Sequence, residues 1–195
     1  MRHRFAEIVF TPSVKAAQRR YNGSELQRAA AADPRLELGV REREFIAARD
    51  SFYLATVSET GWPHVQHRGG PVGFLQVLAP TTIGFADFGG NRQYVSVGNL
   101  GHDGRLALIL MDYPNRRRLK ILGRARVIDA TQADPELLAR LAPARGEGTV
   151  ERLVLIQVEA FDWNCSQHIT PRYTEAEWRS RLSEPEHPHQ QRSAQ

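Results

Sequence analysis

The sequence has very little cysteine and no long apolar run, and both absences limit what the chain can be. Its one cysteine, Cys165, excludes an intrachain disulfide and any metal site built from several cysteines. No apolar stretch approaches the roughly 20 residues that cross a bilayer, and no apolar segment follows the basic N-terminus. We therefore expect no membrane segment and no secretory signal. A reducing, cytoplasmic setting is the simplest one for such a chain.

The charge balance is only modestly basic. The 195 residues carry 26 Lys and Arg against 22 Asp and Glu, a formal net charge of +4. A nucleic-acid-binding protein can carry such an excess, but no recognisable binding motif accompanies it. Attraction of phosphorylated small molecules explains the same excess. We therefore expect a small anionic ligand and no nucleic-acid partner.

A series of short strands predicts the fold. From Ser51 onward, six or seven apolar segments alternate with turn signals such as Gly61-Trp62-Pro63 and Tyr113-Pro114-Asn115. Together with one helix near residues 93–100, this pattern is typical of a closed antiparallel barrel. We predict a mainly β (α+β) fold with flanking helices, which pack on the barrel and take no part in catalysis.

Composition divides the chain into three segments. Residues 1–41 are predicted to form a helical extension, with one helix after Thr11-Pro12, the pattern of a capping residue and a first-turn proline, and another over 24–32. Residues 42–182 are predicted to form the barrel domain. The polar tail, residues 183–195, is expected to be disordered because it has almost nothing to bury.

Two clusters that combine glycine with arginine at strand ends are the strongest functional signals. Gly89-Gly90-Asn91-Arg92-Gln93 follows an apolar strand and precedes a helix, whose first N–H groups and dipole favour an anion. Gln66-His67-Arg68-Gly69-Gly70 is the second cluster. Glycine lets the backbone approach a ligand closely, and arginine can hold phosphate oxygens with two parallel bonds. The two clusters predict a phosphorylated ligand.

Longer segments around these clusters resemble a known family. The runs DSFYLATVSETGWPHVQHRGGPVGFL, GFADFGGNRQYVSVGNL and LILMDYPNRRRLKILGRARV are similar to the FMN-binding split-barrel flavoproteins related to pyridoxamine 5′-phosphate oxidase, with a resemblance that spans about residues 42–172. It implies a split β-barrel that binds FMN at the interface of a homodimer. The implied activity is that of an oxidoreductase acting on a small organic substrate.

Two details qualify this implied activity. The strand over residues 64–68 departs from the authentic oxidase, which has an Arg followed by a Leu-Leu-Lys run there. That departure argues against vitamin B6 chemistry but not against a flavin. A nicotinamide electron donor would visit from solution, because the chain has no dinucleotide-binding fingerprint.

The resemblance also implies which residues contact FMN. Arg92 and Gln93 stand where the family has a basic pair on the FMN phosphate. The glutamine leaves only one cation there, so Arg68 would supply the second, and Ser96 would also hold the phosphate. Gln66 and Asn91 would bond the ribityl chain or the ring edge. The complete predicted set is His64, Val65, Gln66, His67, Arg68, Asn91, Arg92, Gln93, Ser96, Arg118 and Gln167.

Residues later in the chain are implied to reach the flavin from other segments. Arg118 would come from the partner subunit, with Lys120 on the same strand face in reserve. Gln167 and His168 follow the last core strand, and His168 is the candidate for proton transfer. We identify no other catalytic acid or base, and no spacing of residues predicts a metal site.

Other interpretations of these residues stay open. Arg68, His67 and Arg92 could be solvated, Asn91 could only cap a helix, and Arg118 could belong to an arginine-rich surface hairpin. For function, the alternative is a carrier or sensor that holds flavin or haem in a related split barrel without turnover. An absorption spectrum distinguishes the two cofactors.

Overall fold

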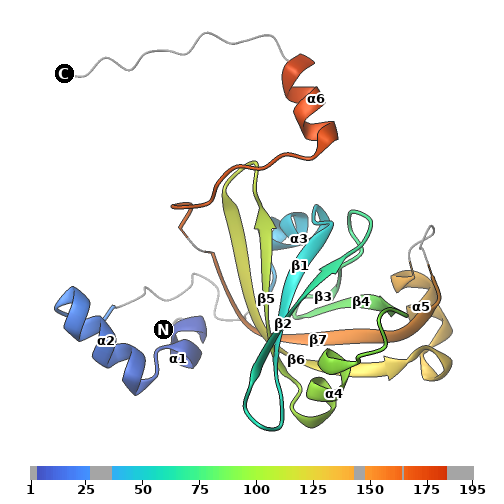
Figure 1. Cartoon of the computed structure of the whole chain (residues 1–195), viewed down its shortest axis with the longest axis horizontal. Coiled ribbons are helices and arrows are strands. Elements are labelled where there is room, and N and C mark those ends of the chain that lie inside the picture. The colour runs from blue at the N-terminus through green and yellow to red at the C-terminus, as the bar shows by residue number, and fades with distance from the viewer. Residues whose placement is uncertain (1–3, 27–36, 143–147, 164, 184–195) are drawn as a thin grey trace.

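A single antiparallel sheet of seven strands lies at the centre of the computed structural model, which describes residues 4–26, 37–142, 148–163 and 165–183 (Figure 1). The order in the sheet is β2-β1-β5-β6-β7-β4-β3. The predicted mainly β fold with flanking helices is confirmed. The strands are β1 Ser51–Val57, β2 Pro63–Gly69, β3 Gln76–Ala79, β4 Thr82–Phe88, β5 Arg105–Asp112, β6 Arg117–Asp129 and β7 Val150–Trp163.

The sheet is not closed by backbone hydrogen bonds, so the expectation of a closed barrel is wrong. β2 and β3 are the two edges of the sheet. β3 has only four residues, and its register with β4 shifts between Val77 and Ala79, which leaves little regular edge for β2 to join. Side chains join β2 to β4 instead, because Arg68 Nη1 lies 2.5 Å from Asp87 Oδ1. The barrel is therefore split between β2 and β4.

Alternation of side chains along β1 builds the core. Phe52 and Leu54 point inward and are each 1% exposed, whereas Tyr53 between them is exposed on the outer face. The ring of Phe52 is stacked on Phe74 at 5.5 Å and meets Phe85 edge-on at 5.3 Å, between ring centroids. Period-two alternation places Phe52 and Phe85 on the inner face of the sheet, and Phe74 from the loop before β3 packs against both.

β6 and β7 are long enough to run through both halves of the sheet, and they bend at a bulge. The register between them shifts between Leu122 and Gly123. A Cβ atom at Gly123 would lie 2.6 Å from the carbonyl oxygen of Gln157, closer than any real contact allows. Only glycine lets the two backbones approach this closely at the bend.

Helices flank the sheet, and their starts follow the expected capping chemistry. Thr11 Oγ1 accepts a hydrogen bond from Val14 N at 3.4 Å, and Asp134 Oδ1 accepts one from Leu137 N at 3.0 Å. None of the helices in the described ranges is long and apolar enough to cross a membrane. The helices are α1 Arg4–Val9, α2 Pro12–Asn22, α3 Val40–Ala47, α4 Val95–His102, α5 Pro135–Leu141 and α6 Glu175–Ser183.

Several boundaries differ from the prediction. The short helices α1 and α6 were not expected, and α4 begins two residues later than predicted. Residues 24–26 are not helical, and the rest of the helix predicted over 24–32 lies outside the described residues. Ser183, predicted to begin the disordered tail, ends α6, and residues 184–195 also lie outside the described residues. The division into three segments stays a prediction.

Candidate functional site

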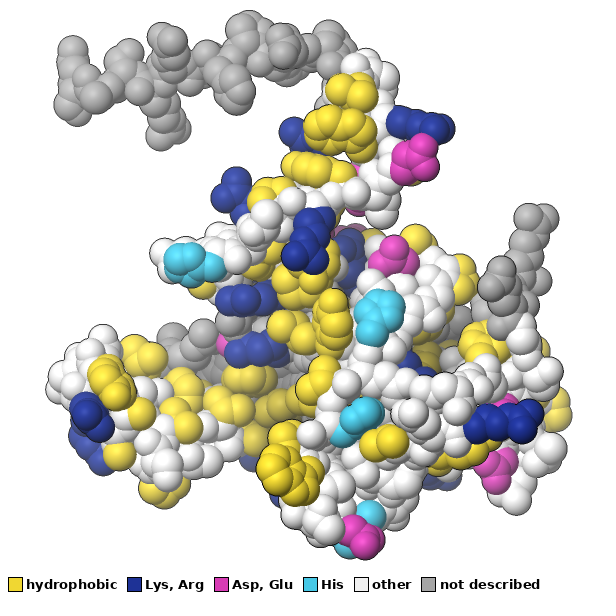
Figure 2. Space-filling view, in the orientation of Figure 1, with side chains coloured by type: hydrophobic (Ala, Val, Ile, Leu, Met, Phe, Trp, Pro, Cys, Tyr) yellow, Lys and Arg dark blue, Asp and Glu magenta, His cyan; other side chains and the backbone are white. Residues whose placement is uncertain are grey.

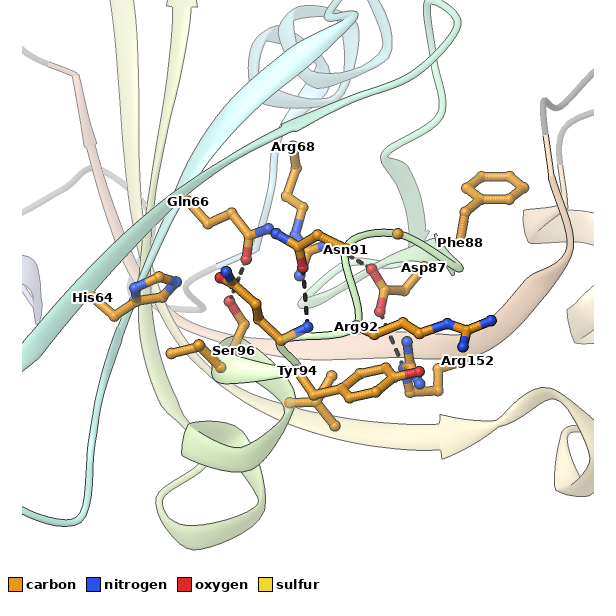
Figure 3. Close-up of a pocket in the computed structure, with 14 residues that line it drawn as sticks. His64, Gln66, Arg68, Asp87, Phe88, Asn91, Arg92, Tyr94, Ser96 and Arg152 are labelled. Carbon is orange, nitrogen blue, oxygen red and sulfur yellow. Dashed lines mark hydrogen bonds and ion pairs between the residues drawn. The ribbon is translucent and has the colours of Figure 1, made fainter.

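An open pocket of about 340 Å³ lies at the split of the sheet (Figure 3). Its walls come from β2, the end of β4, the following loop, the first turn of α4 and β7. Residues of both glycine-containing clusters therefore lie around one pocket. The lining residues are His64, Gln66, Arg68, Asp87, Phe88, Gly90, Asn91, Arg92, Gln93, Tyr94, Val95, Ser96, Val97 and Arg152.

β2 contributes alternate side chains to the pocket. His64, Gln66 and Arg68 line it, because every second residue of a strand points to the same face. Val65 is 63% exposed on the opposite face, and the ring of His67 there contacts that of Tyr53 edge-on at 5.6 Å. Of the five β2 residues predicted to contact FMN, three therefore line this pocket and Val65 and His67 do not.

The loop before α4 has an unusual backbone. Arg92 has φ 61° and Tyr94 has φ 51°, both in the left-handed region that L-residues seldom adopt. Asn91 does not begin or cap the helix. Its Oδ1 accepts a hydrogen bond from Gln93 N at 3.1 Å, which holds the turn. Such local strain costs about 1–3 kcal/mol per residue and is concentrated at functional sites.

The start of α4 offers backbone donors to the pocket. Tyr94 is the residue before the helix, and its side chain makes no capping hydrogen bond. Val95, Ser96 and Val97, the first helical residues, all line the pocket. Their N–H groups have no acceptor within the helix, and alternating left- and right-handed residues bring successive N–H groups together. This end of the pocket is suited to an anion.

Side-chain hydrogen bonds hold α4 against the sheet. Ser96, 2% exposed, donates from Oγ to Gln66 Oε1 on β2 at 2.9 Å. One turn later, Asn99 Nδ2 donates to Thr56 Oγ1 on β1 at 3.0 Å. The bond from Ser96 occupies the carbonyl oxygen of the Gln66 amide. The NH₂ group of Gln66 is therefore available as a donor to a ligand.

Sequence reasoning missed an ionic cluster in the wall. Asp87 is 4% exposed, and it bonds Arg68 through Oδ1 at 2.5 Å and Arg152 Nε through Oδ2 at 3.1 Å. Arg152 also reaches Glu151 at 2.5 Å, and its guanidinium lies 5.0 Å from the ring centroid of Tyr94. The one signal for it in the sequence was Asp87 itself, the one charged residue of the strand β4.

The cluster keeps Arg152 charged. Burial opposes the charge, but hydrogen bonds to Asp87 and Glu151 outweigh burial and raise the pKa of the Arg152 guanidinium above its ordinary value. A cation held in this way is present at any physiological pH. Arg152 therefore supplies fixed positive charge to the wall of the pocket.

Some polar groups in the pocket have no partner in the described part of the chain. His64 Nε2 and Arg68 Nε are buried and make no hydrogen bond there. The exposed Arg92 makes no ion pair with any described residue. Buried polar atoms are usually paired, so these two are candidates to bond a ligand at this site. With the N–H groups of α4, these donors fit a phosphorylated ligand that also carries a polar ring, as FMN does.

Besides Val65 and His67, three more predicted residues lie outside this pocket. Arg118 begins the second half of the β5–β6 hairpin, and its Nε is buried without a hydrogen-bond partner among the described residues. Gln167 and His168 are exposed after the end of β7, and His168 has φ 62°. Their contacts with a flavin stay predictions. Within the described ranges, no group of three His, Cys, Asp or Glu side chains could hold a metal ion.

Comparison with known proteins agrees with this architecture. The family model for pyridoxamine 5′-phosphate oxidase matches residues 41–163, more than half of the chain. HupZ of Group A Streptococcus is 15% identical and aligns over 69% of this chain and 99% of its own, with a TM-score of 0.51. A candidate pyridoxamine 5′-phosphate oxidase of Lactobacillus delbrueckii is 21% identical and aligns over 66% and 96%, with a TM-score of 0.50. At these identities the likeness shows the fold alone, and it confirms the split-barrel prediction. No curated protein matches the chain.

Proposed function

Because the chain belongs to the pyridoxamine 5′-phosphate oxidase family, we propose that it binds FMN in the pocket between β2 and α4 and acts as an oxidoreductase on a small organic substrate. Bound flavin would supply hydride transfer, whereas the protein positions the ring and the substrate. The observation that carries the proposal is the end of the pocket suited to an anion, where Arg92, which makes no ion pair with a described residue, lies beside the first turn of α4.

Each wall of the pocket has a task in this proposal. The backbone N–H groups at the start of α4, that of Ser96 among them, and the guanidinium of Arg92 bind the phosphate. Gln66 donates its NH₂ group to the ribityl chain or the ring edge, and His64 Nε2 meets a polar atom of the ring. The volume of about 340 Å³ is near the lower end of small-molecule sites. A flavin would therefore extend beyond the pocket and need a second surface to cover its ring.

The direct test is the ligand that the purified protein carries. We expect a flavin absorption spectrum, and we expect mass spectrometry to identify FMN after denaturation. Reduction of the bound flavin by a nicotinamide donor, followed by reoxidation with a substrate, would support an oxidoreductase. A haem spectrum would instead favour the carrier or sensor, as would a flavin that no donor reduces. We also propose a cytoplasmic location, where the exposed thiol of Cys165 would stay reduced.

We further propose that a second copy of the chain covers the flavin. The outer face of β1 and β2 exposes apolar side chains: Val65 is 63% exposed, Val57 42% and Tyr53 38%. Figure 2 shows hydrophobic side chains gathered over the part of the sheet near β1 and β5, with Lys and Arg side chains beside them. A symmetric dimer through this outer face would bury them. Because β2 is an edge strand, a flavin that extends from the pocket past β2 would reach this interface, where Arg118 and Gln167 of the other subunit would complete its site.

Replacing Val65 by aspartate is expected to separate the subunits and release FMN, because it places a charge in the apolar interface. Sedimentation velocity, read at a protein wavelength and a flavin wavelength, would show a flavin-free monomer. Val72→Asp is the matched control, since Val72 is 70% exposed in the turn before β3 and not on the outer face of the sheet. A Val65→Asp monomer that keeps its flavin would contradict the shared site.

A further inference from the structure

Asp87 is a buried carboxylate in a strand that is otherwise apolar. It is 4% exposed, next to Ala86 at 6% and Phe85 at 1%. Burying a carboxylate costs several kcal/mol unless it is paired and hydrogen-bonded. A neutral apolar residue at this position would avoid that cost. The position of Asp87 therefore calls for an explanation beyond folding.

The two partners of Asp87 come from opposite sides of the split. Arg152 is its direct neighbour in the register between β4 and β7. Arg68 comes from β2, the far edge of the sheet, with no backbone ladder between β2 and β4. Each oxygen of Asp87 takes one guanidinium, at 2.5 Å and 3.1 Å (Figure 3). The carboxylate thus holds two cations together in one wall of the pocket.

Both arginines keep donors for a ligand. Arg68 uses one terminal nitrogen for Asp87, which leaves its other terminal nitrogen. Arg152 uses Nε for Asp87 and one terminal nitrogen for Glu151, which leaves its other terminal nitrogen. The ring of Tyr94 lies over Arg152 and restricts it further. Two guanidiniums that share one carboxylate would repel each other if the carboxylate were removed.

We infer that Asp87 is a positioning residue, which holds Arg68 and Arg152 together as a clamp for the anionic group of the ligand, and that Arg152 binds this group directly. The inference rests on the proposed function, in which the anionic group is the phosphate of FMN. Asp87 acts through the arginines and does not touch the ligand. Arg152 then belongs to the ligand-binding set, although no feature of the sequence pointed to it.

The variant Asp87→Asn tests the positioning role. Asparagine keeps the size of the side chain but removes the charge that holds both guanidiniums. Affinity for FMN is expected to fall about tenfold, as for other residues that orient a ligand-binding group, whereas affinity for riboflavin, which lacks the phosphate, should hardly change. Glu159→Gln is the matched control, because Glu159 pairs with Arg124 at 2.7 Å away from the pocket. It should alter neither affinity.

Arg152→Lys tests whether Arg152 binds the anionic group of the ligand directly. It also tests the inference if Asp87→Asn fails to fold. Lysine keeps the positive charge but loses the planar pair of donors. We again expect a loss of FMN affinity of about tenfold with riboflavin binding retained. Equal losses for both flavins would mean that Arg152 only supports the fold, and would overturn its assignment to the ligand.

The remaining outcomes are distinct. A selective gain of FMN affinity in Asp87→Asn would mean that the carboxylate competes with the phosphate for the arginines, and would overturn the inference. A parallel loss for FMN and riboflavin together with a lower melting temperature would show a structural role only. If the wild type discriminates between the flavins and Asp87→Asn discriminates equally, the inference alone fails. If the wild type does not prefer FMN, the proposed function fails too.

Discussion

Replacing Arg92 by alanine is expected to weaken FMN binding about 10- to 150-fold and to leave riboflavin binding nearly unchanged. A charge-assisted hydrogen bond contributes roughly 1.5–3 kcal/mol, which corresponds to that range of affinity. Arg92 is a clean target because it has no ion pair within the described chain. Its removal leaves no buried carboxylate behind. Arg68→Ala is less clean, because it also strips Asp87 of a partner.

The backbone at Arg92 dictates the choice of variant and control. At φ 61°, alanine keeps the Cβ atom and therefore the backbone strain, whereas glycine would relieve the strain and change the loop as well. Arg116→Ala is a close control, because Arg116 is also exposed, has φ 50° and lies in the β5–β6 turn away from the pocket. Isothermal titration with each flavin gives the comparison. Equal losses for FMN and riboflavin in Arg92→Ala would refute the phosphate assignment.

Local chemistry in the sequence predicted much of the fold. The β1–β2 hairpin follows from two apolar segments around Gly61-Trp62-Pro63, and α2 begins where Thr11 and Pro12 indicate. Alternation along β2 puts Gln66 and Arg68 on one face. The sequence did not predict the helices α1 and α6, because both are short and bury little. Phe5 in α1 is buried, and α6 has no buried residue. A short helix without an apolar stripe has no periodicity to detect.

The parts of the site that the sequence could not predict depend on contacts between distant segments. Asp87 meets Arg152 because β4 pairs with β7, and it meets Arg68 because the sheet curls until β2 faces β4. Neither pairing leaves a local signal. The glycines of the loop do not mark its unusual backbone either, since the left-handed conformations fall on Arg92 and Tyr94.

The core beside the pocket provides the largest expected effect on stability. Replacing Phe52 by alanine is expected to lower the free energy of unfolding by about 3–5 kcal/mol, because the cavity cannot fill by relaxation alone. Phe52 is 1% exposed between the rings of Phe74 and Phe85. It is also the direct cross-strand neighbour of Arg68, so the cavity would open beneath the wall of the pocket.

The measurement should use flavin-free protein, because a ligand that binds the folded state adds its own stability. For a chain of this size, the expected loss corresponds to a fall in melting temperature of about 6–20 °C. Tyr21→Ala, which truncates an aromatic ring that is 79% exposed, should change the free energy of unfolding by less than about 0.5 kcal/mol. Affinities for FMN and riboflavin should fall together in Phe52→Ala, unlike in Arg92→Ala, because loosening the wall affects the whole ligand. A loss of stability below about 1 kcal/mol would show that Phe74 and Phe85 collapse into the space, or that Phe52 does not anchor the core.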